Sequence, residues 1–287
     1  MAKTPDATVN SAEAAAPTAL AASVTEQILP REDISGTAIL TLNRPAARNS
    51  LSEAMLEALG DALNTIAHDR SVRAVIITAN GPAFSAGHDL KELNARRTDA
   101  DRGRAYFKHI MGLCSGVMQQ IVMLPQPVIA AVQGTATAAG CQLVASCDLA
   151  VASRAAKFAT PGVNIGLFCS TPMVALSRNV PRKQAMEMLL TGEPIAAEDA
   201  ARIGLVNHVV EPGNEREAAL ELAKKITAKS ALTLKIGKEA FYRQIEMPLG
   251  EAYRYASEVM VENMMARDAE EGISAFIDKR RPNWENR

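Results

Sequence analysis

The sequence predicts an α/β fold, because short apolar runs typical of buried strands alternate with segments whose apolar residues recur at helical spacing. The chain has 287 residues, of which 48% are hydrophobic and 22% charged, the composition of a globular protein with a sizeable core. No apolar run reaches the length of about 20 residues that a membrane helix needs.

The first half of the chain shows this alternation in order. A strand is predicted at residues 37–42, and Ser50 and Glu53 then form the S-x-x-E pattern of a helix start, with apolar residues at helical spacing to residue 66. The β-branched run at 72–78 predicts a strand buried on both faces. A helix at about 100–123 ends at Pro125 and Pro127, before a strand at 128–132, a small-residue loop at 133–137 and a helix at 138–146.

The second half becomes helical. Short strands are predicted at 149–152 and 157–159, helix over most of 171–203 with a break at 192–194, and a last strand at 204–211. Only amphipathic helix follows. We therefore divide the chain into a flexible Ala-rich leader (1–33), an α/β core (34–212) and a C-terminal helical region (213–287).

The leader contains nine Ala and no periodic apolar pattern, so it is expected to be loose. Its two basic and five acidic residues match neither a secretory signal nor an Arg-rich transit peptide, which favours a cytoplasmic protein.

Charge and cysteine usage exclude several classes. Lys and Arg number 31 against 32 Asp and Glu, so the net charge of -1 argues against a nucleic-acid-binding surface. The four Cys and four His form neither a C-x-x-C nor an H-E-x-x-H pattern, so neither a metal site nor a disulfide framework is predicted.

Two strand-loop-helix junctions are rich in small residues. They are residues 84–92 (Phe-Ser-Ala-Gly-His-Asp-Leu-Lys-Glu) and 134–142 (Gly-Thr-Ala-Thr-Ala-Ala-Gly-Cys-Gln). Each brings an open backbone to the end of a buried strand, and each precedes a helix whose first N–H groups are unpaired. Two such N–H groups converging on one oxygen would form an oxyanion hole, worth about 2.7–4 kcal/mol per donor. The alternative is that both are plain turns required by tight packing.

Four motifs occur in order: Asn-Arg-Pro…Arg-Asn-Ser-Leu at 43–51, the loop at 84–90, Ala-Gly-Cys-Gln-Leu-Val-Ala-Ser-Cys-Asp at 139–148, and Lys-Phe-Ala-Thr-Pro at 157–161. Together they resemble the crotonase superfamily, the enoyl-CoA hydratase/isomerase family, over about residues 34–287. Residues 159–172 narrow the resemblance to the enoyl-CoA hydratase domain-containing protein 3 subgroup. The resemblance implies a crotonase-type spiral of ββα turns with a C-terminal helical trimerisation region, and a homotrimer or hexamer.

The resemblance also implies an acyl-CoA thioester ligand. Its carbonyl would lie between the backbone N–H groups of His88 and Ala139, which would stabilise an enolate. The His88 side chain is either part of the pocket wall or an acid or base. CoA belongs to the substrate, so no separate cofactor is implied.

The residues implied to contact CoA lie in three places. Arg48 corresponds to the adenine-diphosphate end, the first loop supplies several positions, and a C-terminal segment reaches the CoA of a neighbouring subunit. The positions in the loop and in that segment are Ala86, Asp89, Leu90, Lys91, Phe276 and Lys279. For the Lys and Arg residues, the alternative is an ordinary solvated surface charge.

The sequence departs from the family at the two Glu that activate water and deliver a proton. Gln142 occupies the first position and Gly162 the second. Each such acid or base typically contributes about 10²–10⁴-fold to the rate. The loss of both should therefore reduce ordinary hydratase turnover severely. Asp89, Glu92, a Cys169 or Ser170 nucleophile, or a bound water or bicarbonate beside Gly162 could replace them. The protein is therefore a hydratase- or isomerase-like enzyme with unusual chemistry, a non-catalytic acyl-CoA binder, or a catalyst of another crotonase reaction.

Overall fold

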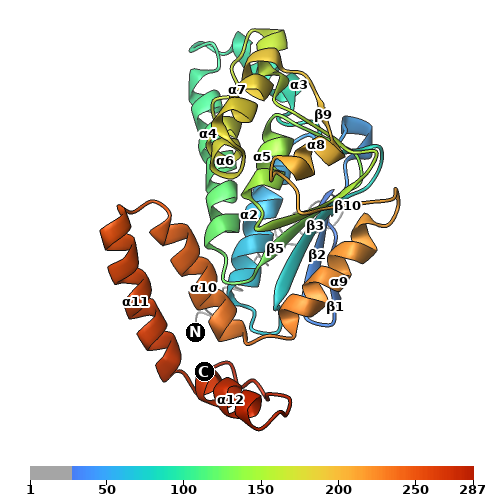
Figure 1. Ribbon diagram of the computed structural model, residues 1–287. Helices are drawn as coiled ribbons and strands as arrows, with labels where there is room; N and C mark the ends of the chain where they lie inside the picture. Colours follow the sequence, from blue (N-terminus) through green and yellow to red (C-terminus); the bar gives the residue numbers. More distant parts are fainter. Residues whose placement is uncertain (1–27) are drawn as a thin grey trace, which may run out of the picture.

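A computed structural model describes residues 28–287 and contains two β-sheets, with helices on both faces of the larger one (Figure 1). The larger sheet has the order β1-β2-β3-β5-β7-β10 and is parallel except for the antiparallel β1–β2 pair. Its strands are Arg31–Ile34, Thr37–Leu42, Ala74–Ala79, Val128–Val132, Leu149–Ser153 and His208–Val210.

The smaller sheet has the order β4-β6-β8-β9. Strands β4 (Ala83–Ser85), β6 (Thr135–Thr137) and β8 (Lys157–Ala159) are parallel, and β9 (Ile195–Ala196) runs antiparallel to β8. Because β4 and β6 pair, this sheet brings together the two small-residue loops, which lie far apart in the sequence.

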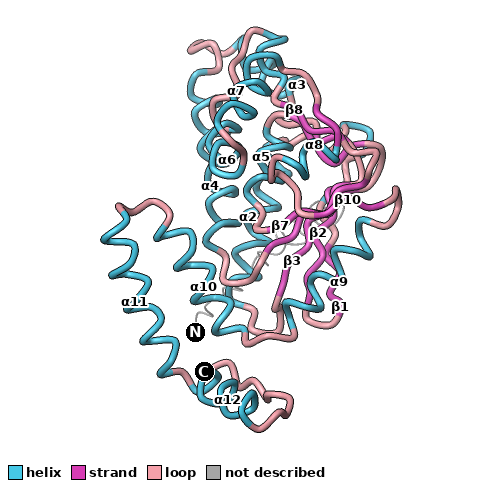
Figure 2. The backbone as a smooth tube through the Cα atoms, viewed as in Figure 1, coloured by secondary structure: helices cyan, strands magenta, loops and turns pink. Residues whose placement is uncertain are grey.

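The helices connect the strands and then continue alone (Figure 2). Those of the first part are the 3-10 helix η1 (Pro45–Ala47), α2 (Glu53–His68), α3 (Leu90–Ala95), η2 (Arg96–Thr98), α4 (Arg104–Met123) and α5 (Ala139–Ser146). Those of the second part are η3 (Pro161–Ile165), α6 (Pro172–Asn179), α7 (Arg182–Thr191), α8 (Ala197–Arg202), α9 (Glu215–Thr227), α10 (Ala231–Gln244), α11 (Leu249–Met265) and α12 (Arg267–Ile277).

The larger sheet is buried on both faces, as the β-branched run predicted. In β3, Val75 and Ile77 belong to the core cluster under α2, α4 and α5, whereas Ile76 belongs to a second cluster on the opposite face. Side chains of a strand point alternately to its two faces, so one strand feeds both clusters. The second cluster is covered by Ala219 and Ala223 of α9.

Three expected boundaries differ from the structure. Residues 31–33, placed in the leader, belong to β1, because their backbone pairs with β2, and Leu29 is buried in the core. Residues 1–27 of the leader lie outside the described residues. Helix α9, placed with the C-terminal helical region, packs on the sheet. Ser50 is not the cap of α2: Ser52 is, its Oγ accepting a hydrogen bond from the Met55 N–H at 3.3 Å.

Helices α10, α11 and α12 extend away from the core as an arm (Figures 1 and 2). A buried polar cluster holds its first helix to the core. The Lys238 ammonium donates to the carbonyls of Ile121 and Gln126 and, at 2.7 Å, to the Asp148 carboxylate. Tyr242 also donates to Asp148, at 3.0 Å. Every donor of the Lys238 ammonium is satisfied, which a buried charge requires.

The arm exposes large apolar side chains. Their exposed fractions reach 85% for Phe276, 79% for Met265 and 75% for Leu249. Large exposed apolar side chains gathered on one part of a protein are typical of an interaction surface. Within residues 28–287, none of the helices is both long and apolar enough to span a bilayer.

Candidate functional site

The first small-residue loop, between β4 and α3, is held by the segment that follows η1. The Ala86 N–H donates to the Arg48 carbonyl at 3.0 Å, and the Leu51 N–H donates to the Gly87 carbonyl at 2.8 Å. Leu51 and His88 form an isolated parallel bridge. The Gly87 carbonyl and the His88 N–H belong to one planar trans peptide group, so the His88 N–H points away from Leu51.

The Asn49 side chain holds the segment that follows η1 in place through three hydrogen bonds. Its buried side-chain amide accepts a hydrogen bond from the Arg44 N–H at 2.7 Å and donates to the carbonyls of Asn80 and Ala83, each at 2.8 Å. Its backbone is left-handed, with φ of 51°, a conformation that Asn tolerates better than most residues. Asn49 therefore ties the segment after η1 to the start of β4.

Asp89 has a structural role as the N-cap of α3. Its carboxylate accepts hydrogen bonds from the Lys91 and Glu92 N–H groups at the start of α3, and from the Ser50 hydroxyl at 3.0 Å. Burial raises the pKa of Asp89, but these bonds and the Arg44 guanidinium outweigh burial, so that the pKa lies below its ordinary value. Glu92 is also engaged, since its carboxylate accepts from the Glu53 N–H at the start of α2. Neither carboxylate is free to replace a missing acid or base.

The second loop, between β6 and α5, is pressed against the first. A Cβ atom added to Gly140 would lie 2.3 Å from the Ser85 carbonyl oxygen. A Cβ added to Gly87, which has φ of +86°, would lie 2.9 Å from the Ala138 Cβ and 3.2 Å from the Ala139 nitrogen. Only glycine allows these approaches, so the two loops meet at Gly87 and Ala139.

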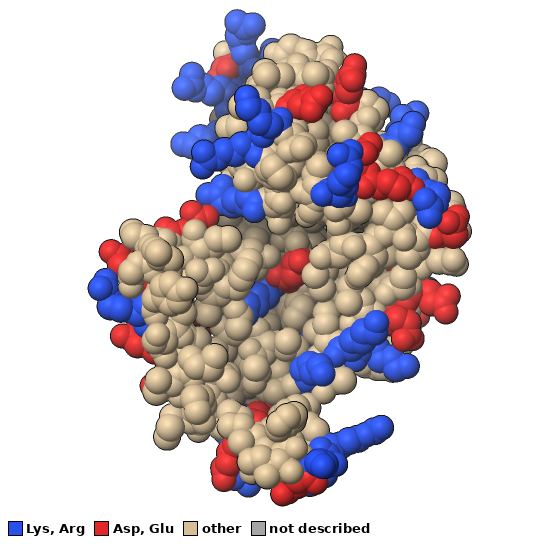
Figure 3. Space-filling model, in the orientation of Figure 1, with Lys and Arg blue, Asp and Glu red and all other residues tan. Residues whose placement is uncertain are grey.

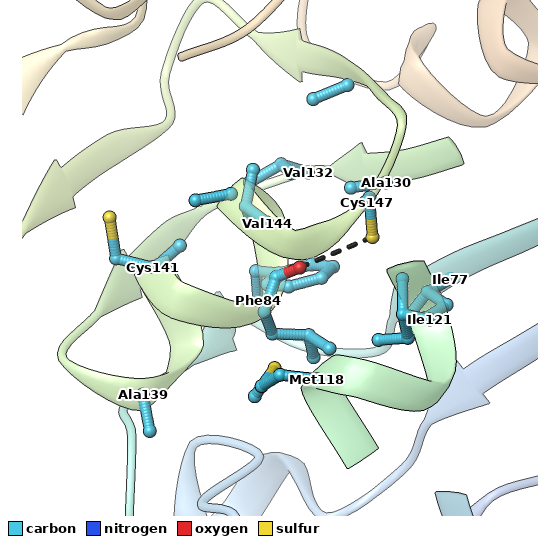
Figure 4. Close-up of a cluster of buried hydrophobic side chains, with 14 of the residues drawn as sticks. Ile77, Phe84, Met118, Ile121, Ala130, Val132, Ala139, Cys141, Val144 and Cys147 are labelled. Carbon is cyan, nitrogen blue, oxygen red and sulfur yellow. Dashed lines mark hydrogen bonds between the residues drawn. The ribbon is translucent and has the colours of Figure 1, made fainter. Parts of the chain in front are cut away.

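The N–H groups of His88 and Ala139 donate to no other group among the described residues. Ala139 is the first residue of α5, where the helix leaves its N–H groups unpaired and its dipole favours negative charge. The helix is anchored in the core: Phe84 lies between Val144 of α5 and Met118 and Ile121 of α4 (Figure 4). The peptide that carries the His88 N–H therefore adjoins the start of α5, since the Gly87 Cβ position lies 3.2 Å from the Ala139 nitrogen.

Ala138 is strained. Its φ of 50° and ψ of -119° belong to a region that L-residues rarely occupy, at a cost of about 1–3 kcal/mol. Two hydrogen bonds keep it there: its N–H donates to the Ala159 carbonyl at 2.9 Å, and its carbonyl accepts from the Gln142 N–H at 3.0 Å. This conformation sets the direction of the next peptide N–H, that of Ala139.

We expect Ala138→Gly to raise the free energy of unfolding by about 1 kcal/mol, because relief of strain exceeds the entropic cost of glycine. The control is Ala136→Gly in β6, a fully buried alanine two residues away whose backbone is that of a strand. It should lower stability. Chemical denaturation of both variants measures the two changes, and a destabilised Ala138→Gly protein would contradict the strain.

The His88 imidazole is partly buried. Its Nδ1 and Nε2 are both closed off from solvent, and neither has a hydrogen-bond partner of ordinary geometry among the described residues. Burial lowers the pKa of His88, and the nearby Leu51 backbone offsets this only in part. The ring is therefore neutral at neutral pH.

His88 should make stability depend on pH. Its folded pKa lies below the unfolded value of about 6.5, so the unfolded chain binds the proton first as the pH falls. Stability contributed by the neutral ring is present above about pH 6.5 and is lost below it. Urea denaturation between about pH 7.5 and 5 should show a smaller loss for His88→Gln than for the wild type. Parallel losses in the two proteins would contradict the prediction.

Gln142 and Gly162 stand at the positions of the missing Glu pair. Gln142 is buried, and its Oε1 is without a hydrogen-bond partner among the described residues. Gly162 faces no empty space: an added Cβ would lie 2.8 Å from the Leu167 carbonyl oxygen and 2.9 Å from the Cys169 sulfur. An added Cβ is therefore crowded by the chain. The expectation of an anion or water where the lost carboxylate would lie stays a prediction.

Cys169 is held by the same turn. Its sulfur accepts a hydrogen bond from the Gly162 N–H at 3.3 Å. Burial raises the pKa of the thiol, and the bond from Gly162 offsets this only in part. A neutral thiol is a poor nucleophile, which argues against Cys169 as the attacking group. All four cysteines are free and buried, and in residues 28–287 no three His, Cys, Asp or Glu side chains gather as metal ligands would.

The remaining implied CoA contacts are exposed. Arg48, Ala86, Leu90 and Lys91 lie on the surface around the first loop. Lys and Arg side chains gather at the end of the molecule that carries α3 and α7 (Figure 3). Phe276 and Lys279 lie at the end of the arm, remote from α3 in the same chain (Figure 1).

The family model described as enoyl-CoA hydratase/isomerase matches residues 32–287. The chain belongs to the enoyl-CoA hydratase/isomerase family. This confirms the resemblance and the crotonase-type α/β fold predicted from the motifs.

Family members of the predicted subgroup are among the similar proteins. The rat protein named "Enoyl-CoA hydratase domain-containing protein 3, mitochondrial" is 51% identical over 245 residues, 85% of this chain and 80% of the rat protein. A crystal structure of the human enoyl-CoA hydratase domain-containing protein 3 superposes with a TM-score of 0.85 at 48% identity, covering 90% of this chain and all of that one. An enoyl-CoA hydratase structure from Mycobacterium smegmatis gives the same TM-score at 54% identity, covering 90% and 98% of the two chains.

Sequence reasoning missed three residues of this site. Asn49 lies within the motif at 43–51, Ala138 is the first residue of the helix predicted at 138–146, and Thr160 precedes Pro161. No sequence signal identifies Thr160, whose buried hydroxyl has no partner among the described residues.

Proposed function

We propose that the protein binds an acyl-CoA thioester, with the thioester carbonyl oxygen between the backbone N–H groups of His88 and Ala139. The observation that carries the proposal is the approach of the two loops, with the Gly87 Cβ position 3.2 Å from the Ala139 nitrogen. Neither donor has an acceptor among residues 28–287, and the two lie on a bridged loop and at a helix N-terminus. Donors held in this way need no reorganisation as negative charge develops on the oxygen.

The chemistry proposed is enolate stabilisation with little ordinary hydration. Gln142 cannot titrate, Gly162 has no side chain and no room for one, and Asp89 and Glu92 cap helices. Loss of a general acid or a general base typically lowers the rate by about 10²–10⁴-fold, so hydration should be slow. Acyl-CoA binding, with turnover far below that of ordinary hydratases, is the activity that this site supports best.

We propose that the other contacts to the ligand come from two places: cationic side chains beside the first loop, and the arm of a neighbouring subunit. Lys91 and Arg48 lie at the surface beside the first loop, where phosphate groups of CoA would find cations. We also propose that the chain self-associates as a trimer or hexamer through the apolar arm, which places Phe276 and Lys279 at the CoA of a neighbouring subunit. The cytoplasmic location remains a proposal; the relatives of the subgroup are named as mitochondrial.

The first test is calorimetry of the full chain with short, medium and long saturated acyl-CoA, together with a hydration assay on the matching enoyl-CoA. Binding with hydration at or below about 10⁻² of an ordinary hydratase supports the proposal. If none of the acyl-CoA ligands binds, the proposal fails. Hydration at an ordinary rate would show that another group supplies the acid and base.

Restoring the two carboxylates should have unequal results. Gln142→Glu changes one buried amide into a carboxylate of the same shape, and we expect hydration to rise by up to about 10²-fold. Gly162→Glu must displace the Leu167 carbonyl and the Cys169 sulfur, so it should cost about 1–3 kcal/mol of stability. The control Gln142→Leu keeps the size without the carboxylate and should show no gain. Equal stability of Gly162→Glu and the wild type would contradict the packing argument.

A further inference from the structure

We call residues 280–287, which fold back along α12, the C-terminal strap. After α12 the chain reverses direction at Lys279, whose backbone is left-handed with φ of 53°. The Arg280 guanidinium then donates to both oxygens of the Glu271 carboxylate, at 2.7 and 2.8 Å. The same carboxylate accepts from the Asn283 N–H at 2.7 Å. The bonds from Arg280 and Asn283 lower the pKa of Glu271 to about 2, so this anchor of the strap stays charged at neutral pH.

Asp268 holds the other end of the strap. It lies in the first turn of α12 and is only 1% exposed. Its carboxylate accepts hydrogen bonds from the N–H groups of Glu285 and Asn286, at 2.7 and 3.0 Å. The Asp268 N–H in turn donates to the Arg287 carbonyl at 3.1 Å. A buried carboxylate requires such donors, so the strap is bonded along α12 from one end to the other.

Trp284 joins the strap to the turn between α9 and α10. Its indole N–H donates to the Ala228 carbonyl at 2.9 Å. The Ala231 N–H donates to the side-chain oxygen of Asn286 at 2.8 Å, which adds a second bond between the strap and this turn. The indole ring also lies against α12, since a Cβ atom added to Gly272 would be 3.1 Å from it. The Trp284 side chain thus packs on the helix and bonds to the turn.

The turn is fixed to the core, whereas α12 lies outside it. The Arg73 guanidinium, directly before β3, donates to the Lys229 carbonyl in this turn. None of the described residues of α12 belongs to either core cluster, and the helix lies at the end of the arm against α11 (Figure 1). Its side chains Ile273, Phe276 and Ile277 are 51%, 85% and 71% exposed. The orientation of α12 on its own chain therefore depends on α11 and on the strap.

We infer that Trp284 is a positioning residue for the CoA of a neighbouring subunit. By joining the strap to the fixed turn, it orients α12 and so sets the place at which Lys279 meets the phosphates. The inference rests on the proposed function, because it needs Lys279 of one subunit to reach the CoA bound by the next. Trp284 acts through Lys279 and does not itself touch the ligand. A cation held in place in advance loses less freedom when the ligand binds.

The test is a double-mutant cycle, with butyryl-CoA binding to the full chain measured by calorimetry. Lys279→Ala and Trp284→Ala should each weaken binding by about 10-fold, the usual size for the loss of one charge-assisted contact. Because the two residues act through one contact, the double variant should also lose about 10-fold, whereas independent contributions would multiply to about 100-fold. Unchanged affinity in either single variant, or the multiplied loss in the double variant, would overturn the inference. If the wild type binds no acyl-CoA, the proposed function itself has failed.

Trp284→Phe separates positioning from a general effect on folding or assembly. It keeps an aromatic ring beside Gly272 and loses only the bond to the Ala228 carbonyl. Light scattering should therefore give the wild-type number of subunits, and the affinity should fall less than in Trp284→Ala. A changed number of subunits in both variants, together with the loss of affinity, would assign Trp284 to assembly and overturn the inference.

Detachment of the strap can be followed by fluorescence, because Trp284 is the single tryptophan of the chain. Asp268→Ala removes the acceptor of two strap N–H groups, so the indole should enter water and its emission should shift to longer wavelength. The affinity for butyryl-CoA should then fall by about 10-fold, as in Trp284→Ala. The control Glu258→Ala, at an exposed position of α11, should change neither emission nor affinity. A shifted emission with wild-type affinity would overturn the inference, since the strap would be detached without consequence for the ligand.

Discussion

Gly87→Ala should abolish acyl-CoA binding while leaving the protein folded. The new methyl group would lie 2.9 Å from the Ala138 Cβ, 3.0 Å from the Thr137 carbonyl oxygen and 3.2 Å from the Ala139 nitrogen. None of these atoms belongs to a flexible side chain, so the loops must separate and the two N–H groups no longer converge. Loss of one oxyanion donor costs about 10²–10³-fold in known enzymes, and we expect a loss of at least this size in affinity or turnover.

The control for Gly87→Ala is Gly213→Ala. Gly213 also has positive φ, +92°, but an added Cβ would meet no atom within 4 Å. Both variants should lose about 1–2 kcal/mol of stability from the left-handed backbone, because that cost is independent of contacts. Only Gly87→Ala should lose binding, measured by calorimetry with the same acyl-CoA. Undiminished binding by the Gly87→Ala protein would remove the basis of the proposed function.

Lys238→Met should cause the largest loss of stability. Lys238 and Asp148 form an ion pair at 2.7 Å, with side chains only 7% and 15% exposed. Burial lowers the pKa of Lys238, and the Asp148 carboxylate opposes this effect. The charged ammonium therefore depends on its carboxylate partner. Removing one partner of a buried pair costs about 3–5 kcal/mol, because the other charge is left uncompensated. The melting temperature should fall by about 10 °C.

Lys235→Met on the same helix provides the control, since Lys235 is exposed. It should change stability by less than about 0.5 kcal/mol. Limited proteolysis distinguishes local from global effects: in Lys238→Met, cleavage should begin within the arm, because the pair joins α10 to the core. Equal melting temperatures for the two Lys variants would contradict the role assigned to the buried pair.

The central strands of the larger sheet were predictable because their apolar runs are long enough to be recognised as strands in the sequence. Strand β5 was predicted with the bounds observed, and the β-branched run of β3 correctly indicated burial on both faces. Strands β4 and β6 have three residues each and β9 has two, too few for a period to show in the sequence. Helix α9 was predicted as a helix, but nothing in its own pattern shows that the sheet is its partner.

The part of the candidate site that could be predicted is the pair of loops whose backbone N–H groups are the proposed donors. The two small-residue loops marked the position of the proposed donors, since the need for small side chains is visible in the sequence. The surroundings of Gly162 were not predictable, because the Leu167 carbonyl and Cys169 come from a turn whose path depends on the whole fold. The Thr160 hydroxyl was missed for the same reason, because its lack of a partner within the described part of the chain depends on three-dimensional packing.

The packing at Gly162 also bears on how this lineage can change. A single codon change could supply Glu at position 162, but the Leu167 carbonyl and the Cys169 sulfur would meet it at once. The turn at 167–169 would have to be remodelled before a carboxylate at this position could be accommodated. Acid–base chemistry from residue 162 therefore requires several substitutions made together, because a change at this residue alone is opposed by the path of the turn.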